Sequence, residues 1–182
     1  MKITLAGAPG SGKSTLRKSL AEHYGLEVKA VGDFMRQAAQ RHGYTDITAF
    51  LCEYVTQHPE VDHQIDEEQR AYGASHSHFV LDSHVGFHFV PDSLKIRLEC
   101  DVEEAARRIL AAKRSTEAAG TFEQAVEANR RREEAMHANF LRLYGVDIHD
   151  DRNFDITVDT SSLSPEEVFA ELVRQIDALS PA

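Results

Sequence analysis

The chain has 182 residues, of which 20 are Lys or Arg and 30 are Asp or Glu, so its formal net charge is -10. This acidic balance argues against a general binder of nucleic-acid polymers or anionic membranes, and no apolar run approaches the length of a membrane-spanning helix. Cys52 and Cys100 lie far apart without a C-x-x-C spacing, so we expect reduced thiols in a cytoplasmic protein. The length of the chain predicts one domain, 1–182.

The first residues predict a strand that leads into a phosphate-binding loop. The apolar run 3–6 precedes the pattern G-x-x-x-x-G-K-[ST]. Glycine at three loop positions lets backbone N–H groups turn inward around phosphate oxygens, and a helix that begins near Lys13 adds a partial positive charge. We therefore expect nine successive residues to hold a nucleoside triphosphate: Gly7, Ala8, Pro9, Gly10, Ser11, Gly12, Lys13, Ser14 and Thr15.

The segment after the loop predicts a helix, a short strand and a long helical region. Apolar residues recur at helical spacing until Gly25, which ends the first helix, and residues 26–31 fit a second strand. From Asp33, an expected N-cap, to about residue 72 the pattern is helical, with breaks at Gly43 and Pro59. This region is a helical excursion between the second and third strands.

The rest of the chain alternates strands and helices. A helical pattern covers 102–144 with a polar break at 116–121, and a further helix opens at Ser164. Apolar runs predict three more strands: 79–82, 94–98 and 154–158. Such alternation is typical of a parallel sheet covered by helices on both faces. The sequence therefore predicts an α/β fold of the P-loop NTPase class with a five-stranded parallel sheet.

An acidic residue and two groups of cations suit phosphoryl transfer. Asp82 ends the third strand, beside the first, where it can hold Mg²⁺ together with Ser14 or simply cap the strand. Cations cluster in 107–114 and 130–132, and a break separates them, so we expect a hinged lid over about 108–132 rather than two solvated helix faces. Four cations are predicted to be catalytic: Lys13, Arg108, Arg114 and Arg131.

Four histidines lie close together at positions 76, 78, 84 and 88, but their spacing matches no zinc pattern. His84 differs from the others because it lies just past Asp82, at the mouth of the expected second pocket. We expect it to donate a hydrogen bond to a phosphate there, with a charge that depends on pH.

Shorter motifs follow the loop in a fixed order. They are Gly32-Asp33-Phe34-x-Arg36, Pro59-Glu60-Val61-Asp62-x-x-Ile65-Asp66, the strand ending at Asp82, Leu94-Lys95-Ile96, Arg108-Ile109, Arg131-Arg132-Glu133-Glu134, Tyr144-Gly145-Val146-Asp147-Ile148 and Phe154-Asp155-Ile156 with Asp159-Thr160-Ser161. Along nearly its whole length the chain resembles the nucleoside monophosphate kinases, most closely the archaeal-type cytidylate kinases. The resemblance implies MgATP-dependent phosphorylation of CMP, or of dCMP or UMP, with an acceptor-binding region at 33–72 and the lid at 108–132. The expected acceptor contacts are Asp33, Arg36, Asp66 and His84.

Two departures from the pattern of this family involve three residues. Ser83 and His84 stand where a Gly and an Arg are usual, and Asn139 replaces another arginine. His84 and Arg142 can supply replacement donors, or else the acceptor is a small molecule other than a nucleotide. A third hypothesis is an ATP-binding switch with little transfer. For the leading hypothesis we expect only small-molecule nucleotides as ligands, and a monomer or weak homodimer.

Overall fold

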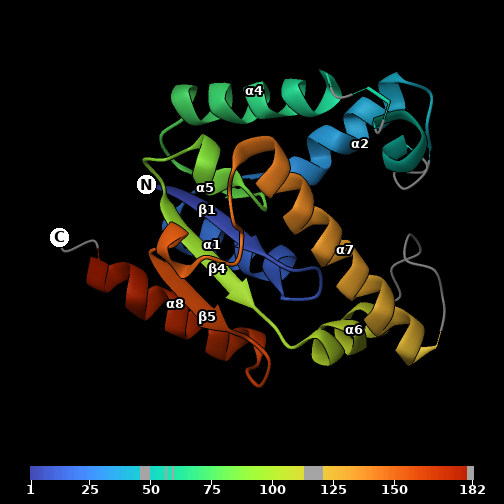
Figure 1. The fold of residues 1–182 in the computed structure, drawn as a ribbon. Helices are drawn as coiled ribbons and strands as arrows, with labels where there is room; N and C mark the ends of the chain where they lie inside the picture. Colours follow the sequence, from blue (N-terminus) through green and yellow to red (C-terminus); the bar gives the residue numbers. More distant parts are fainter. Residues whose placement is uncertain (46–49, 56, 59, 113–120, 180–182) are drawn as a thin grey trace.

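The structure is a computed structural model that describes residues 1–45, 50–55, 57–58, 60–112 and 121–179. Its centre is a parallel sheet in the order β2-β3-β1-β4-β5 (Figure 1). The strands are β1 (Lys2–Gly7), β2 (Glu27–Ala30), β3 (Phe79–Asp82), β4 (Leu94–Glu99) and β5 (Ile156–Asp159). The predicted five-stranded parallel sheet is confirmed, and β3 pairs directly with β1 as expected.

Helices cover both faces of the sheet because the strands are apolar on both. Ile3 and Leu5 of β1 are fully buried in the main core, together with residues of α1 (Lys13–Tyr24) and α8 (Pro165–Leu179). On the other face lie α5 (Gly86–Phe89) and the C-terminal half of α7 (Phe122–Tyr144) (Figure 1). The short helix α5 was not predicted. Among the described residues, no helix is both long and apolar enough to span a membrane.

The excursion between β2 and β3 is mainly helical where the structure describes it, and no strand interrupts it among those residues. It contains α2 (Val31–Arg41), the π-helical turn η1 (Phe50–Val55) and α4 (Glu60–Ser75). The chain breaks after α2 at Gly43, where φ is +81°, as predicted, whereas the predicted break at Pro59 falls outside the described residues. Asp33 was wrongly predicted as an N-cap: β2 runs straight into α2, so Ala30 is the N-cap and Asp33 lies in the first turn.

The predicted lid, about 108–132, includes the end of α6 (Val102–Ala111) and the first part of α7. Asp101 caps α6 by accepting from the N–H groups of Glu103 and Glu104, and Thr121 opens α7 with a capping box. Residues 113–120, between the two helices, are outside the described part of the chain. β5 begins two residues later than predicted because the 3₁₀ turn η2 (Asp151–Asn153) precedes it.

Candidate active site

The loop between β1 and α1 has a backbone that only glycine can adopt at two of its positions. Gly7 has a φ of +146°, and a Cβ there would lie 2.4 Å from the carbonyl oxygen of Leu98. Gly10 has a φ of +89°, and its Cβ would lie 2.6 Å from the carbonyl oxygen of Ala105. Both the conformation and the space therefore demand glycine, and the loop is packed closely against β4 and α6.

Lys13 lies along this loop. Its Nζ donates to the carbonyl oxygens of Gly7 at 2.5 Å and of Ala8 at 2.9 Å. Because Lys13 is also the first residue of α1, its ammonium group and the positive end of the helix act on the same space. This is the geometry of a phosphate-binding loop, as the sequence predicts.

A cavity of about 460 Å³ opens on one side of the loop. One wall consists of loop and α1 residues, which present polar groups. The remaining lining comes from α6, from the segment between β5 and α8, and from the start of α8, and it combines apolar with polar side chains. The lining residues outside the loop and α1 are Glu104, Arg108, Ile109, Ala112, Thr160, Leu163, Pro165 and Val168. Such a mixed cavity suits a ligand with an anionic end and a flat, apolar end. We call it the donor cavity.

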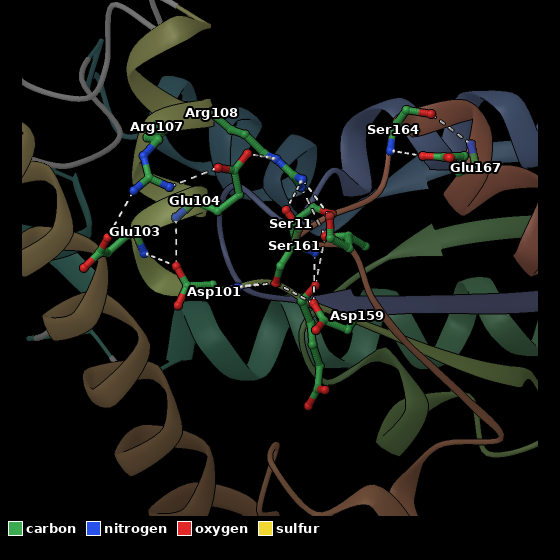
Figure 2. Close-up of polar contacts among 12 residues, drawn as sticks. Ser11, Asp101, Glu103, Glu104, Arg107, Arg108, Asp159, Ser161, Ser164 and Glu167 are labelled. Carbon is green, nitrogen blue, oxygen red and sulfur yellow. Dashed lines mark hydrogen bonds and ion pairs between the residues drawn. The ribbon is translucent and has the colours of Figure 1, made fainter.

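Arg108 belongs to the wall of the donor cavity. Its Nη2 donates to the carbonyl oxygen of Thr160 at 2.6 Å, and its Nε to Oε1 of Glu104 at 3.0 Å. Figure 2 shows the side chain turned towards Ser161, whereas Arg107 points the other way, to Glu103. The guanidinium plane of Arg108 is therefore fixed, as stacking on a ligand requires. Its predicted catalytic role stays a prediction.

Thr160 connects this wall to the loop itself. Its hydroxyl is buried, 2.9 Å from the carbonyl oxygen of Glu99 and 3.2 Å from that of Ser11, and either oxygen can accept its single proton. The hydroxyl oxygen of Thr160 itself accepts a hydrogen bond from Nη1 of Arg108 at 3.1 Å. Sequence reasoning missed Thr160, although its position directly after a strand that ends beside the loop is a usable signal.

Asp82 ends β3 close to Lys13, as predicted, but it has a protein partner. Its Oδ2 accepts from Nη1 of Arg17 at 3.1 Å, and both side chains are mostly buried. Burial raises the pKa of Asp82, while the charges of Lys13 and Arg17 oppose this rise. Arg17 was not predicted as a site residue, and only the packing of α1 against β3 brings it there.

His84 lies just past β3 and is held as a neutral imidazole. Burial, followed by the charges of Lys13 and Arg132, lowers its pKa to about 3. The expected dependence of its charge on pH therefore falls well below neutrality, because burial disfavours the charged imidazolium and two nearby cations add to this effect. A neutral imidazole can still donate one hydrogen bond to a phosphate oxygen.

A second cavity, of about 350 Å³, opens on the α7 side of the loop. Its lining includes the loop residues Gly7 and Ala8, the imidazole of His84, and Glu133 and Met136 of α7. It shares no lining residue with the donor cavity. Of the four predicted acceptor residues, only His84 contributes to it. The phosphate loop therefore separates two distinct cavities.

The other predicted acceptor residues are engaged with protein partners. Arg36 and Asp33 form an ion pair within α2, and both are substantially exposed. Asp66 of α4 is buried, and its Oδ2 accepts from the hydroxyl of Tyr144 of α7 at 2.5 Å. Burial raises the pKa of Asp66, which this hydrogen bond partly counteracts. The structure thus does not gather these three residues at one point.

The residues that depart from the family pattern form hydrogen bonds with neighbouring side chains. The buried hydroxyl of Ser83 donates to Oε1 of Gln69 on α4 at 2.7 Å. Nη2 of Arg142 donates to Oδ1 of Asn139 at 2.7 Å. Both pairs lie on elements that border the region between α4 and α7, where the acceptor is expected.

One face of α7 is turned towards the loop, and it differs from the one predicted. Asn129 is buried against Pro9, and Arg132 lies near His84. Arg131 is exposed and pairs with Glu127 at 2.8 Å. A helical repeat of 3.6 residues explains the difference, because adjacent positions point about 100° apart. Arg132, rather than the predicted Arg131, is the α7 cation near the loop, and Arg114 lies outside the described residues.

Both the fold and the loop define a P-loop kinase, and comparisons with known proteins agree. The AAA domain family model matches residues 3–137. A shikimate kinase from Acinetobacter baumannii, solved in complex with shikimate, has the same fold with a TM-score of 0.67, at 16% identity over 100% of this chain and 95% of that one.

Two relatives with higher sequence identity indicate which group of P-loop kinases the chain resembles. The cytidylate kinase of Thermococcus kodakarensis is 35% identical over 99% of this chain and 90% of its own length. An S-adenosylmethionine-dependent nucleotide dehydratase of Lacinutrix mariniflava is 38% identical over 94% of this chain, but the chain spans only 35% of that protein. The chain belongs to the nucleoside monophosphate kinase family, together with the archaeal cytidylate kinases.

Proposed function

We propose that the chain transfers a phosphoryl group from ATP to a nucleoside monophosphate, with CMP as the expected acceptor and dCMP or UMP as alternatives. The observation that carries the proposal is the pair of cavities beside the phosphate loop: the donor cavity, lined by Lys13 and Ser14, and the second cavity, lined by His84. The likeness to the cytidylate kinase of Thermococcus kodakarensis supports the choice of acceptor.

On the donor side, the triphosphate would lie along the loop, with its nucleoside in the donor cavity. Loop N–H groups and the N-terminus of α1 bind phosphate oxygens. The fixed guanidinium plane of Arg108 and the apolar side chains of Ile109 and Leu163 then suit a base. This division of roles fits ATP better than a donor without a base.

On the acceptor side, the phosphate of the acceptor is itself the nucleophile. One of its oxygens attacks the γ-phosphorus of ATP, the bond to the β–γ bridging oxygen breaks, and ADP leaves. No general base is needed, because this phosphate is already an anion. Lys13 and Arg132 neutralise charge on the oxygens of the transferred group, and His84 donates a hydrogen bond.

The residues present fit a magnesium ion that is held mainly by the nucleotide. Ser14 lines the donor cavity and Asp82 ends the neighbouring strand, and both offer the oxygen ligands that Mg²⁺ prefers. In the described part of the chain, no cluster of three His, Cys, Asp or Glu side chains forms a metal site by itself. Bound Mg²⁺ supplies charge neutralisation of the donor phosphates.

Release of ADP tests the proposal. A coupled assay would measure ADP formation from MgATP with CMP, UMP, dCMP, AMP or GMP as acceptor. We expect CMP to stimulate turnover at least tenfold over the ATP-only background. If no nucleoside monophosphate stimulates turnover, the proposal is wrong.

A second candidate is a kinase of this family whose acceptor is not a nucleotide. Two observations favour it. His84 is held neutral, and Ser83, which stands where the family usually has glycine, donates a hydrogen bond to Gln69. Thermal-shift measurements with nucleoside monophosphates, sugars and hydroxylated cyclic acids separate the two candidates. Stabilisation by monophosphates alone would reject the second one.

A further inference from the structure

The helix α7 has a single buried residue, and it is a polar one. Over 23 residues, only Asn129 is buried, with 5% of its surface exposed. Its Nδ2 donates to the carbonyl oxygen of Pro9 in the phosphate loop, at 3.5 Å, and its Oδ1 is buried without a hydrogen-bond partner. A buried amide that is only partly satisfied lowers stability compared with an apolar side chain of the same size. Packing alone therefore does not account for an asparagine here.

The carbonyl that Asn129 contacts belongs to the same peptide group as a loop N–H. Peptide groups are planar, and no described peptide bond is cis, so the Pro9 carbonyl and the Gly10 N–H point in opposite directions. Fixing the carbonyl towards α7 therefore fixes the Gly10 N–H away from α7. Within the described part of the chain this N–H donates to no acceptor, so it is available to a phosphate oxygen.

Gly10 is also held from its other side. Its α-carbon lies so close to α6 that a Cβ would come within 2.6 Å of the carbonyl oxygen of Ala105. With φ at +89°, Gly10 has a conformation that suits glycine, and the contact with α6 leaves no space for a side chain. The two helices that contribute to the predicted lid thus contact adjacent residues of the loop, α7 at Pro9 and α6 at Gly10.

We propose that Asn129 is a positioning residue for phosphoryl transfer, which orients the Pro9–Gly10 peptide so that the Gly10 N–H addresses the donor phosphates. The inference rests on the proposed function as far as the donor is ATP. It assigns Asn129 no contact with the substrate. We expect its effect to be confined to the donor, because Pro9 and Gly10 line the donor cavity, whereas His84 lines the second cavity.

Two variants and a matched control test this role. Asn129→Leu removes the amide and leaves an apolar side chain of similar volume, and Asn129→Asp keeps the shape but loses the donor group. Ala128→Asn places a new amide on the exposed neighbouring position and keeps Asn129. The measurements are the melting temperature, kcat and KM for MgATP, and KM for CMP.

We expect Asn129→Leu to melt at the same temperature as the wild type or higher, while kcat/KM for MgATP falls at least tenfold in both Asn129 variants. KM for CMP and all parameters of Ala128→Asn should stay within twofold. A merely structural role predicts instead that activity follows stability. The inference is overturned if kcat/KM for MgATP stays within twofold in both Asn129 variants, or if KM for CMP rises as much as KM for MgATP.

Failure of the proposed function remains distinguishable from failure of this inference. If no nucleoside monophosphate stimulates the wild type, the proposed acceptor is wrong. The role of Asn129 is then tested by measuring the affinity for MgATP alone. Calorimetric titration should give a dissociation constant for MgATP that is at least fivefold higher in Asn129→Leu and Asn129→Asp than in the wild type. Equal dissociation constants would overturn the role of Asn129.

Discussion

On the donor side of the phosphate loop, side chains contact one another and line a cavity, whereas three of the four expected acceptor residues, Asp33, Arg36 and Asp66, line neither cavity. Arg108 is fixed by Thr160 and Glu104, and Thr160 is fixed by the loop. By contrast, Arg36 is exposed and pairs within its own helix. Asp66 contacts α7 through one hydroxyl, that of Tyr144.

We expect the two sides to recognise their ligands in different ways. We expect the donor side to bind phosphate largely through backbone groups, whose geometry follows from the strand, the loop and the helix. On the acceptor side we expect recognition by side chains of α2, α4 and α7, of which α2 and α4 share a buried apolar cluster that includes Phe34 and Ile65. We therefore expect substitutions on the donor side to affect every acceptor equally, and substitutions on the acceptor side to change affinity for the acceptor alone.

Removal of the loop lysine should have the largest effect. Lys13→Ala eliminates the cation nearest the transferred group, and we expect kcat to fall about 10³-fold with any acceptor. Lys18→Ala, on the exposed face of the same helix, is the matched control and should keep its activity. Steady-state ADP release with CMP and UMP measures both. A loss that depends on the acceptor would contradict the assignment of Lys13 to the donor side.

The packing of the loop should be the next most sensitive feature. Gly10→Ala combines a positive φ with a contact of 2.6 Å to the carbonyl oxygen of Ala105, so we expect a loss of about 3 kcal/mol in the free energy of unfolding. Gly25 has a φ of +65° but open space around it, so Gly25→Ala should cost only about 1 kcal/mol. Urea unfolding compares the two. Equal losses would show that the loop is less tightly packed than described.

His84 makes a pH-dependent contribution on the acceptor side. Its pKa of about 3 in the folded chain lies below the usual value, so the unfolded chain binds a proton first as the pH falls. His84 therefore lowers stability progressively between about pH 6.5 and pH 3, by about 1.4 kcal/mol for each pH unit.

The variant His84→Asn should remove this dependence. Its stability relative to the wild type should rise as the pH is lowered from 7 to 4, as measured by urea unfolding at each pH. His78→Asn, at an exposed position, serves as the control. A stability difference that does not change with pH would show that His84 is not held neutral.

The contact between α4 and α7 should give the smallest effect. Tyr144→Phe removes the hydroxyl that donates to Asp66, so we expect a loss of about 1 kcal/mol in the free energy of unfolding. KM for CMP should rise severalfold while KM for MgATP stays the same. Tyr24→Phe, which removes an exposed hydrogen bond to Asp177, is the matched control. A change in KM for MgATP would contradict the separation of the two sides.

Much of the fold could be predicted from local patterns. The strand that ends at Gly7 and the one that ends at Asp82 are short apolar runs, and the helix starts at Asp101 and Ser164 carry capping residues with strong local preferences. Asp33 was misassigned because its residue type suits a cap, while the direct passage from β2 into α2 leaves no room for one. The start of β5 was misplaced because a turn precedes it.

The sequence by itself determined the phosphate loop, since its glycines, Lys13 and Ser14 lie in one continuous segment with a defined spacing. Only the tertiary structure decided which side chains meet at the site. Arg17 of α1 pairs with Asp82, Thr160 and Asn129 reach the loop from after β5 and from α7, and a one-position difference on α7 separates Arg132 from the exposed Arg131. The physical reason is that helix rotation and packing, rather than residue type, decide which side of a helix faces the site.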